Sequence, residues 1–136
     1  MREILFRGKQ VDNDEWVYGS FCMDAIEQKN GLCGVDGFIR LYDFAKGKMQ
    51  MHEVDRETVG QFTGLTDKNG VKIFEGDLVK AERVVNGDEW FGSVVWWHGC
   101  FAIQGVTDRN VPAIDLFREY EVIGNLHDNP ELLEVK

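Results

Sequence analysis

The chain has 136 residues, of which 43% are hydrophobic, 12% are aromatic and 29% are charged, and its formal net charge is −9. This is the composition of one globular domain, able to bury about two thirds of the surface that its unfolded chain exposes, and it excludes a disordered chain. The apolar runs are too short for a membrane span, residues 1–20 lack the pattern of a signal peptide, and the negative field repels the phosphates of nucleic acids.

The N-terminal region, residues 1–58, is predicted to form two β-hairpins, because four of its segments are β-prone. These segments are residues 4–6, 16–18, 38–42 and 49–54. Residues 11–15 give a polar connection within the first pair, and Lys46-Gly47 marks the turn within the second. The glycine-containing residues 24–37 are predicted to form a loop between the two hairpins.

The strand predicted at residues 49–54 also indicates which of its faces is buried. Met49 and Met51 alternate with polar residues, and a strand places every second side chain on the same face. We therefore expect the methionine face to pack against the core. Residues 55–58, which follow directly, predict either a single helical turn or a bend.

The C-terminal region, residues 59–136, is predicted to form a small β-barrel of short strands. Tight turns at Asp67-Lys68-Asn69-Gly70 and Glu75-Gly76-Asp77 enclose a short apolar step, which leaves no room for a helix. The further strands expected in this region are residues 78–85, 90–97, 100–104 and 121–125.

Helical structure is predicted only near the C-terminus. Residues 114–120 predict a short helix, and residues 129–133 predict one helical turn. Asn129 is the expected cap of that turn, and Pro130 suits its first position. The predicted fold is therefore mainly β with minor α, in a single domain that spans residues 1–136.

The sequence contains no recognisable motif for a metal, a cofactor or a catalytic nucleophile. His98 and Cys100 are the only His and Cys that lie close together in the sequence, and there is no Cys-x-x-Cys motif. Three cysteines, Cys22, Cys33 and Cys100, are an odd and sparse set, which favours buried thiols in a reduced, cytoplasmic protein over a disulfide framework. Neither serine lies in a Gly-x-Ser-x-Gly elbow. We expect no catalytic residue, no metal and no cofactor.

Glu75 and Asp77 form the most attractive pair of carboxylates. In an extended segment the two share a face, where mutual repulsion raises one pKa and suits acid–base chemistry or a divalent ion. The alternative is a tight corner, in which Gly76 gives backbone freedom and Asp77 accepts hydrogen bonds from the following amides. We favour the corner.

The aromatic residues offer a different kind of site. Trp96 and Trp97 are adjacent on a predicted strand and must point to opposite faces, so one is expected to enter the core. The other is either an anchor for a partner or covered by the N-terminal hairpins. The candidate interaction surface comprises Trp16, Tyr18, Glu75, Asp77, Trp96 and Trp97.

A series of motifs runs in order along nearly the whole chain. These are Met1–Lys9, Glu15–Gly19, Val59–Leu65, Asp67–Gly70, Ile73–Asp77, Val122–Asn125 and Asp128–Leu133. By these motifs the chain resembles the YopX family of uncharacterised phage and prophage proteins, with Phe62 and Phe74 where the family has tyrosine. The resemblance implies a β-rich fold with a small barrel of the Src-homology-3 type, and a phage or mobile-element setting in bacteria. It implies no activity, so no catalytic residue is carried over.

Three functions remain open at this point. The first is a non-enzymatic interaction module that self-associates into a homo-oligomer or binds a host or phage protein. The second is an acidic inhibitor of a host nucleic-acid-binding protein, and the third is an enzyme built around Glu75 and Asp77. Direct binding of nucleic acid is the least expected function, because the sequence shows no basic track. No membrane partner is expected.

Overall fold

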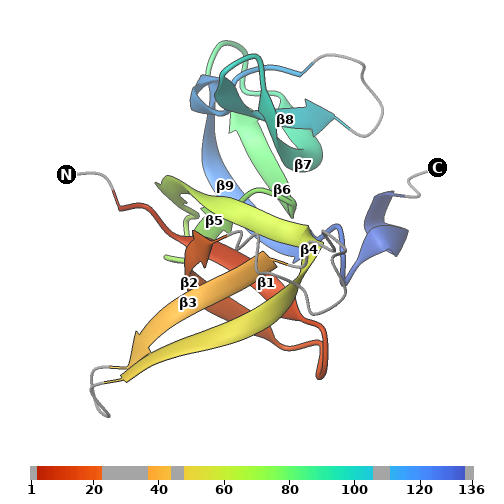
Figure 1. Ribbon diagram of the computed structural model, residues 1–136. Helices are drawn as coiled ribbons and strands as arrows, with labels where there is room; N and C mark the ends of the chain where they lie inside the picture. The colour runs from red at the N-terminus through yellow and green to blue at the C-terminus, as the bar shows by residue number, and fades with distance from the viewer. Residues whose placement is uncertain (1–2, 23–36, 44–47, 106–110, 134–136) are drawn as a thin grey trace. The chain divides into compact units, whose positions relative to one another are not determined.

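The computed structural model describes residues 3–22, 37–43, 48–105 and 111–133, and the predicted mainly β fold is confirmed (Figure 1). The chain divides into two compact units, Met1–Gln61 and Phe62–Lys136. No helix within the described ranges is long and apolar enough to cross a membrane. The loop predicted at residues 24–37 lies almost wholly outside the described residues.

The first unit is an antiparallel sheet of four strands that follow one another along the chain. They are β1 (Phe6–Gln10), β2 (Trp16–Cys22), β3 (Gly37–Asp43) and β4 (Lys48–Thr66). Both predicted hairpins are confirmed, as β1 pairs with β2 and β3 pairs with β4. β2 also pairs with β3, and β1 also pairs with β4, so the pairings run in a ring and each of the four strands has two neighbours.

The core of the first unit is built from Val17, Ile39 and Val54, all of them buried. The predicted burial of the methionine face is wrong, because Met51 is 45% exposed whereas Val54 is fully buried. Side chains of one strand face share the parity of their residue numbers, and the face that contains Val54 is the inner one. The branched side chains of Ile39 and Val54 fill this small core, which places Met51 outside. The side chain of Met49 lies outside the described part.

Residues 55–58 form a bend within β4 and no helical turn. Arg7 of β1 pairs with Gly60 of β4, and Lys9 pairs with Asp55. Between these two pairs β4 therefore advances five residues while β1 advances only two. The hydroxyl of Thr58 donates to the carbonyl oxygen of Asp55 at 2.6 Å and accepts the N–H of Lys9 at 2.8 Å. These bonds hold a wide bulge in the strand, as short hydroxyl side chains do where a ladder is interrupted.

The second unit contains β5 and a separate sheet of four antiparallel strands in the order β8-β7-β6-β9. Its strands are β5 (Lys72–Phe74), β6 (Asp77–Arg83), β7 (Glu89–Trp97), β8 (Cys100–Gly105) and β9 (Phe117–Asn125). β5 pairs with the C-terminal end of β4. The core residues of this unit are Ile73, Val79, Ala81, Val94, Ile103, Ile114 and Phe117. The pairings of the described strands do not join β8 to β9, so the predicted closed barrel stays a prediction.

The helix predicted at residues 114–120 is wrong beyond its first turn. A 3₁₀-helix, η1 (Ile114–Leu116), is followed directly by β9, whose first residue Phe117 pairs with Arg83. The hydroxyl of Tyr120 donates to the carbonyl oxygens of Ile114 and Phe117, at 2.6 and 2.7 Å. Pairing with β6 and burial of Phe117 thus override the local helical pattern.

The last predicted turn is confirmed as a second 3₁₀-helix, η2 (Pro130–Leu133), with Pro130 in its first position. Asn129 directly precedes this helix, in the predicted cap position, and its carbonyl oxygen accepts the N–H of Leu132 at 3.1 Å. Its side-chain oxygen accepts the N–H of Asn125 at 3.2 Å, which fastens the end of β9 to this turn.

Candidate protein-interaction surface

The segment Val94–Ile103, here called the tryptophan hairpin, joins β7 to β8 through the two-residue turn His98-Gly99. His98 has a φ of 48° and Gly99 a φ of 82°. Positive φ at both central residues defines a type I′ turn, whose twist matches that of antiparallel strands. Trp97 and Cys100 pair directly across this turn. In the sequence Trp-His-Gly-Cys, the strand pairing therefore continues up to the two residues of the turn itself.

Both tryptophans of the hairpin are exposed, Trp96 to 55% and Trp97 to 49%. The prediction that one of the two enters the core is therefore wrong. The reason lies in the length of the neighbouring strand, because β6 pairs with β7 only as far as Leu78–Ser93. Beyond Ser93, β8 is the one strand of the described chain that pairs with β7. The hairpin extends past the end of the sheet, and both of its faces meet solvent.

Each tryptophan ring contacts one aromatic neighbour. The centroids of Trp96 and Phe101 are 4.9 Å apart at an interplanar angle of 80°, and those of Trp97 and His98 are 4.7 Å apart at 86°. Edge-to-face contacts of this kind are favourable, and they hold each ring in place before a partner arrives. The tryptophans are thus ordered apolar anchors.

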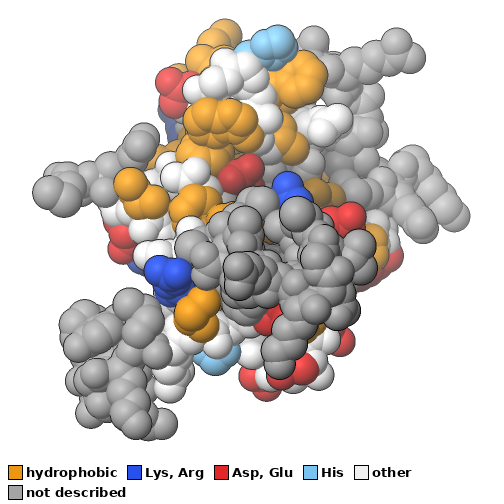
Figure 2. All heavy atoms as spheres, viewed as in Figure 1, with side chains coloured by type: hydrophobic (Ala, Val, Ile, Leu, Met, Phe, Trp, Pro, Cys, Tyr) orange, Lys and Arg blue, Asp and Glu red, His pale blue; other side chains and the backbone are white. Residues whose placement is uncertain are grey.

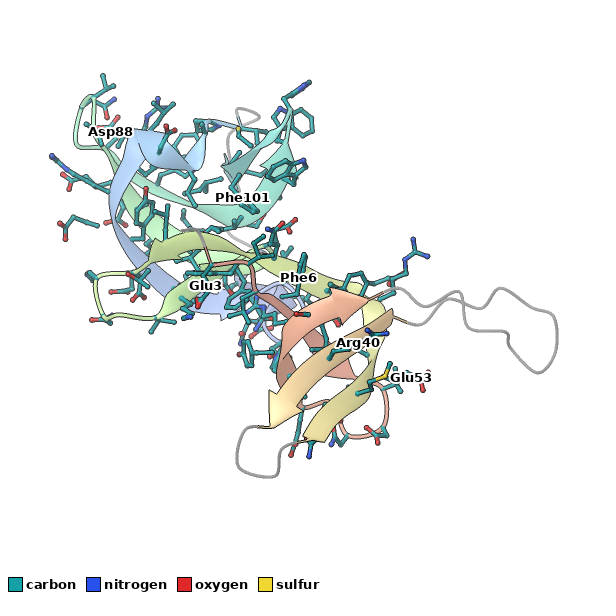
Figure 3. All side chains as sticks on the ribbon, turned by 60° about the vertical axis from the view of Figure 1, so that its left-hand side comes forward. Glu3, Phe6, Arg40, Glu53, Asp88 and Phe101 are labelled. Atoms are coloured by element: carbon teal, nitrogen blue, oxygen red, sulfur yellow. The ribbon has the colours of Figure 1, made fainter. Side chains whose placement is uncertain are left out.

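The segment that carries these rings contains no formally charged residue. Residues 90–107 include no Asp, Glu, Lys or Arg, in a chain of which 29% is charged. Figure 2 shows hydrophobic side chains together with a histidine at the upper end of the view, over the four-stranded sheet. Figure 3 shows Asp88, in the turn at the other end of β7, well apart from Phe101. The tryptophan hairpin is therefore an exposed apolar surface on an acidic protein.

The corner formed by Glu75, Gly76 and Asp77 lies beside the hairpin. Asp77 is 2% exposed, and its carboxylate accepts the N–H of the preceding residue Phe74 at 2.8 Å. Gly76 has a φ of 90°, and its N–H donates to the carbonyl oxygen of Val94 at 2.9 Å. The structure therefore brings the corner to the base of the tryptophan hairpin.

Trp16 and Tyr18 belong to the first unit and form a separate candidate. The guanidinium of Arg7 lies 4.7 Å from the centroid of the half-buried Trp16 ring, a cation–π contact. Tyr18 is 43% exposed. Contact with the buried Arg7 gives Trp16 a role in packing, and Tyr18 is the more accessible of the two.

Asp67 was expected only to open a turn, but it also fastens that turn to β9. Its carboxylate accepts the N–H groups of Asn69, Val71 and Val122 at 2.8, 2.9 and 3.0 Å. Burial opposes ionisation of this carboxyl, but the three N–H donors and the charge of Lys68 outweigh it and hold the pKa of Asp67 below its usual value. The turn motif predicts the hydrogen bonds from Asn69 and Val71, whereas nothing in the sequence near Asp67 predicts the bond from Val122.

A hollow of about 440 Å³ lies against β6 and β9 and is lined mainly by charged side chains. Its lining residues are Lys68, Lys80, Ala81, Glu82, Gly87, Glu89, Glu119 and Glu121. Lys68 pairs with Glu121 at 3.1 Å and Arg118 with Glu82 at 3.3 Å. Glu119 has a φ of 54° at a bulge of β9, where the register with β6 shifts. Opposite charges are thus already paired across this hollow.

The described cysteine and histidine side chains do not gather into a metal site. Cys100 is exposed, so the expectation of a buried thiol is wrong there, and its Sγ lies 3.4 Å from the carbonyl oxygen of Trp97. Within the described ranges, no group of three or more His, Cys, Asp or Glu residues is placed to hold a metal ion. The side chain of Cys22 and the whole of Cys33 are not among the described parts of the chain.

Comparison with known proteins agrees with the motifs. The family model described as YopX protein matches residues 5–134. The structure is similar to protein EF1440 from Enterococcus faecalis, with a TM-score of 0.53, 25% identity, and coverage of 98% of this chain and 100% of that one. It is also similar to protein yopX from Bacillus subtilis, with a TM-score of 0.55, 17% identity, and coverage of 100% and 99%. No curated protein matches the chain. The chain therefore belongs to the YopX family.

Proposed function

We propose that this chain is a non-enzymatic protein-interaction module of phages or prophages, acting in the bacterial cytoplasm, and that the tryptophan hairpin is its binding surface. One observation carries the proposal: Trp96 and Trp97 are both exposed on a hairpin with no charged residue. Tryptophan is enriched among the residues that dominate binding energies, and exposed apolar patches mark interaction sites.

The two exposed tryptophans supply part of the energy that a specific complex needs. Two half-exposed tryptophans offer on the order of 250 Å² of apolar surface, since each ring system buries up to about 250 Å² in full. At about 25 cal/mol per Å², this burial contributes about 6 kcal/mol before the costs of association. A micromolar complex corresponds to about 8 kcal/mol. Association itself costs at least about 4 kcal/mol, so a micromolar complex needs at least about 12 kcal/mol of favourable contacts. The tryptophans thus supply about half of that or less, and the rest comes from the surrounding surface.

The proposed framework for this surface is a small Src-homology-3-type barrel in residues 59–136. It is supported by two register shifts between β6 and β9, one between Leu78 and Val79 and one between Lys80 and Glu82. Bulges bend a strand and increase its twist, as the closure of a small sheet requires.

The test is affinity capture with the full chain immobilised through its N-terminus, from a host lysate to which a tagged second copy of the full chain is added. The wild type is compared with a Trp96→Ala/Trp97→Ala double variant and with Val85→Ala, a control in the turn between β6 and β7 that alters an 80% exposed valine. We expect the double variant to lose the partners that the wild type and the control retain. Equal capture by all three proteins would contradict the proposal.

Inhibition of a host nucleic-acid-binding protein remains a second proposal, and it is supported by the net charge of −9. The pairing of Glu82 and Glu121 with cations weighs against a row of carboxylates that mimics phosphates. An enzyme built on Glu75 and Asp77 is less well supported, because the Asp77 carboxylate is buried and accepts a backbone N–H. In the capture experiment, an inhibitor would bind its target through acidic residues, and the double tryptophan variant would not affect this binding.

A further inference from the structure

The backbone of β7 has an open edge where the tryptophan hairpin leaves the sheet. In an antiparallel pair, successive residues direct their N–H and C=O groups alternately toward one neighbour and the other. Val94 directs its carbonyl away from β8, because that oxygen accepts the N–H of Gly76. Two residues further, Trp96 directs its N–H and C=O to the same side. Among the described residues, no strand pairs with β7 at this position.

Charge restricts where on this molecule a second copy of the chain can bind. A second copy of this chain brings its own charge of −9, and like charges oppose approach through most surfaces. Residues 94–103 carry no charged side chain, so the strands that pair in such a dimer contain no acidic residue. An exposed strand edge flanked by neither lysine nor proline is also the kind that natural proteins otherwise protect.

We propose that the occupant of this edge is a second copy of the chain, paired β7 to β7 and antiparallel, with Trp96 opposite Trp96 on a twofold axis. The proposal rests on the proposed function of the tryptophan hairpin and names its partner. The two Trp96 residues exchange both N–H···O bonds, and Val95 of each copy lies opposite Trp97 of the other. The interface is isologous and closes at two chains.

This arrangement also accounts for the position of the corner. Pairing stops after three residues, because Gly76 already bonds to Val94 on the same edge. The His98-Gly99 turn of each copy then meets the Glu75–Asp77 corner of the other. Four of the six residues of the candidate interaction surface, Glu75, Asp77, Trp96 and Trp97, thus lie in one interface.

Sedimentation equilibrium of the full chain over a concentration and salt series is the first test. We expect a dimer of twice 15.6 kDa that tightens with added salt, because salt screens the net charge of −9. Trp96→Lys should weaken the dimer at least about tenfold, and the matched control Val85→Lys should leave it unchanged. A monomer at all concentrations and salts, or a Trp96→Lys dimer of unchanged affinity, would overturn the inference.

Amide hydrogen exchange on the wild type tests the register without a mutation. The Trp96 amide should become protected as the concentration rises through the dissociation constant. The Trp97 amide, which bonds within the hairpin across the turn, should be equally protected at every concentration. A dimer with an unprotected Trp96 amide would place the interface elsewhere and overturn the inference.

The failure of this inference is distinguishable from the failure of the proposed function. A monomeric chain that captures another protein in a tryptophan-dependent manner would overturn the second copy as occupant and leave the interaction module standing. A dimer whose affinity is unchanged by substitution of Trp96 and of Trp97 would overturn both the inference and the proposed function.

Discussion

The turns and the tryptophan hairpin of the second unit use their residues in opposite ways. Asp67 and Asp77 are charged residues in short turns, yet both are buried and accept backbone N–H groups. Trp96 and Trp97 are large apolar residues, yet both are exposed. At these four positions, carboxylates hold the fold and aromatic rings meet solvent. Residue type alone therefore does not separate structural from functional positions, and measurements of stability and of binding can.

The largest effect on stability is expected at Asp67. Asp67→Ala leaves three N–H groups without their acceptor and should lower the free energy of unfolding by about 3 kcal/mol. Urea denaturation measures this change. Asp88→Ala is the control, because this exposed aspartate also lies in a turn, and its effect should stay within about 0.5 kcal/mol. Equal effects of the two variants would show that the bonds of Asp67 do not fasten the turn.

Asp77→Ala and Gly76→Ala should each destabilise by about 2 kcal/mol, from a lost buried acceptor and from a side chain at positive φ. Thermal denaturation measures both. If Asp77→Ala kept the wild-type melting temperature but abolished partner binding, Asp77 would act in binding, as the tryptophans of the hairpin do. It would then not be a structural carboxylate like Asp67.

The pH dependence of stability sharpens the role of Asp67. The pKa of Asp67 is lowered in the folded chain. Its ionised carboxylate therefore contributes fully to the stability of the fold at any pH above its pKa in the unfolded chain, about 4, and this contribution is lost as the pH falls below that pKa. The difference in melting temperature between wild type and Asp67→Asn should be constant near neutral pH and should shrink below about pH 4. A difference that stayed constant down to pH 2 would mean that ionisation of Asp67 contributes nothing to stability.

The smallest effect on stability is expected at the hairpin. Trp97→Ala should change the free energy of unfolding by less than about 1 kcal/mol, because the ring is half exposed already. Trp90→Ala is the contrasting control, since that ring packs at 5.8 Å on the buried Phe117 and its loss should cost about 3 kcal/mol. A large loss of stability in Trp97→Ala would make this residue part of the packing.

The elements that local sequence determines were predicted well. The hairpins follow from β-prone runs separated by polar or glycine-containing connections, and the last helical turn follows from Pro130. The predictions that depended on distant pairing were wrong. Met51 faces outward because Ile39 and Val54 fill the core, and Phe117 is in a strand because it pairs with Arg83. Neither contact has a signal within its own segment.

The candidate site was predictable to the same extent. Adjacent tryptophans on a strand indicate that at least one is outside, but the exposure of both depends on where β6 stops pairing, at Ser93. The bond from Val122 to Asp67 joins residues 55 positions apart, so the turn motif does not reveal it. The turn residues and the aromatic anchors were found from sequence, whereas the limits of the sheet required the structure.

The ring of pairings in the first unit has a consequence for aggregation. Each of its four strands already has two neighbours, so these strands offer little template to which a further chain adds in register. Ordered aggregates formed at high expression are therefore expected to grow from the second unit, through the open end of β7. A single lysine at position 96 should then improve solubility without altering the first unit, which makes that residue the place to engineer a tractable sample.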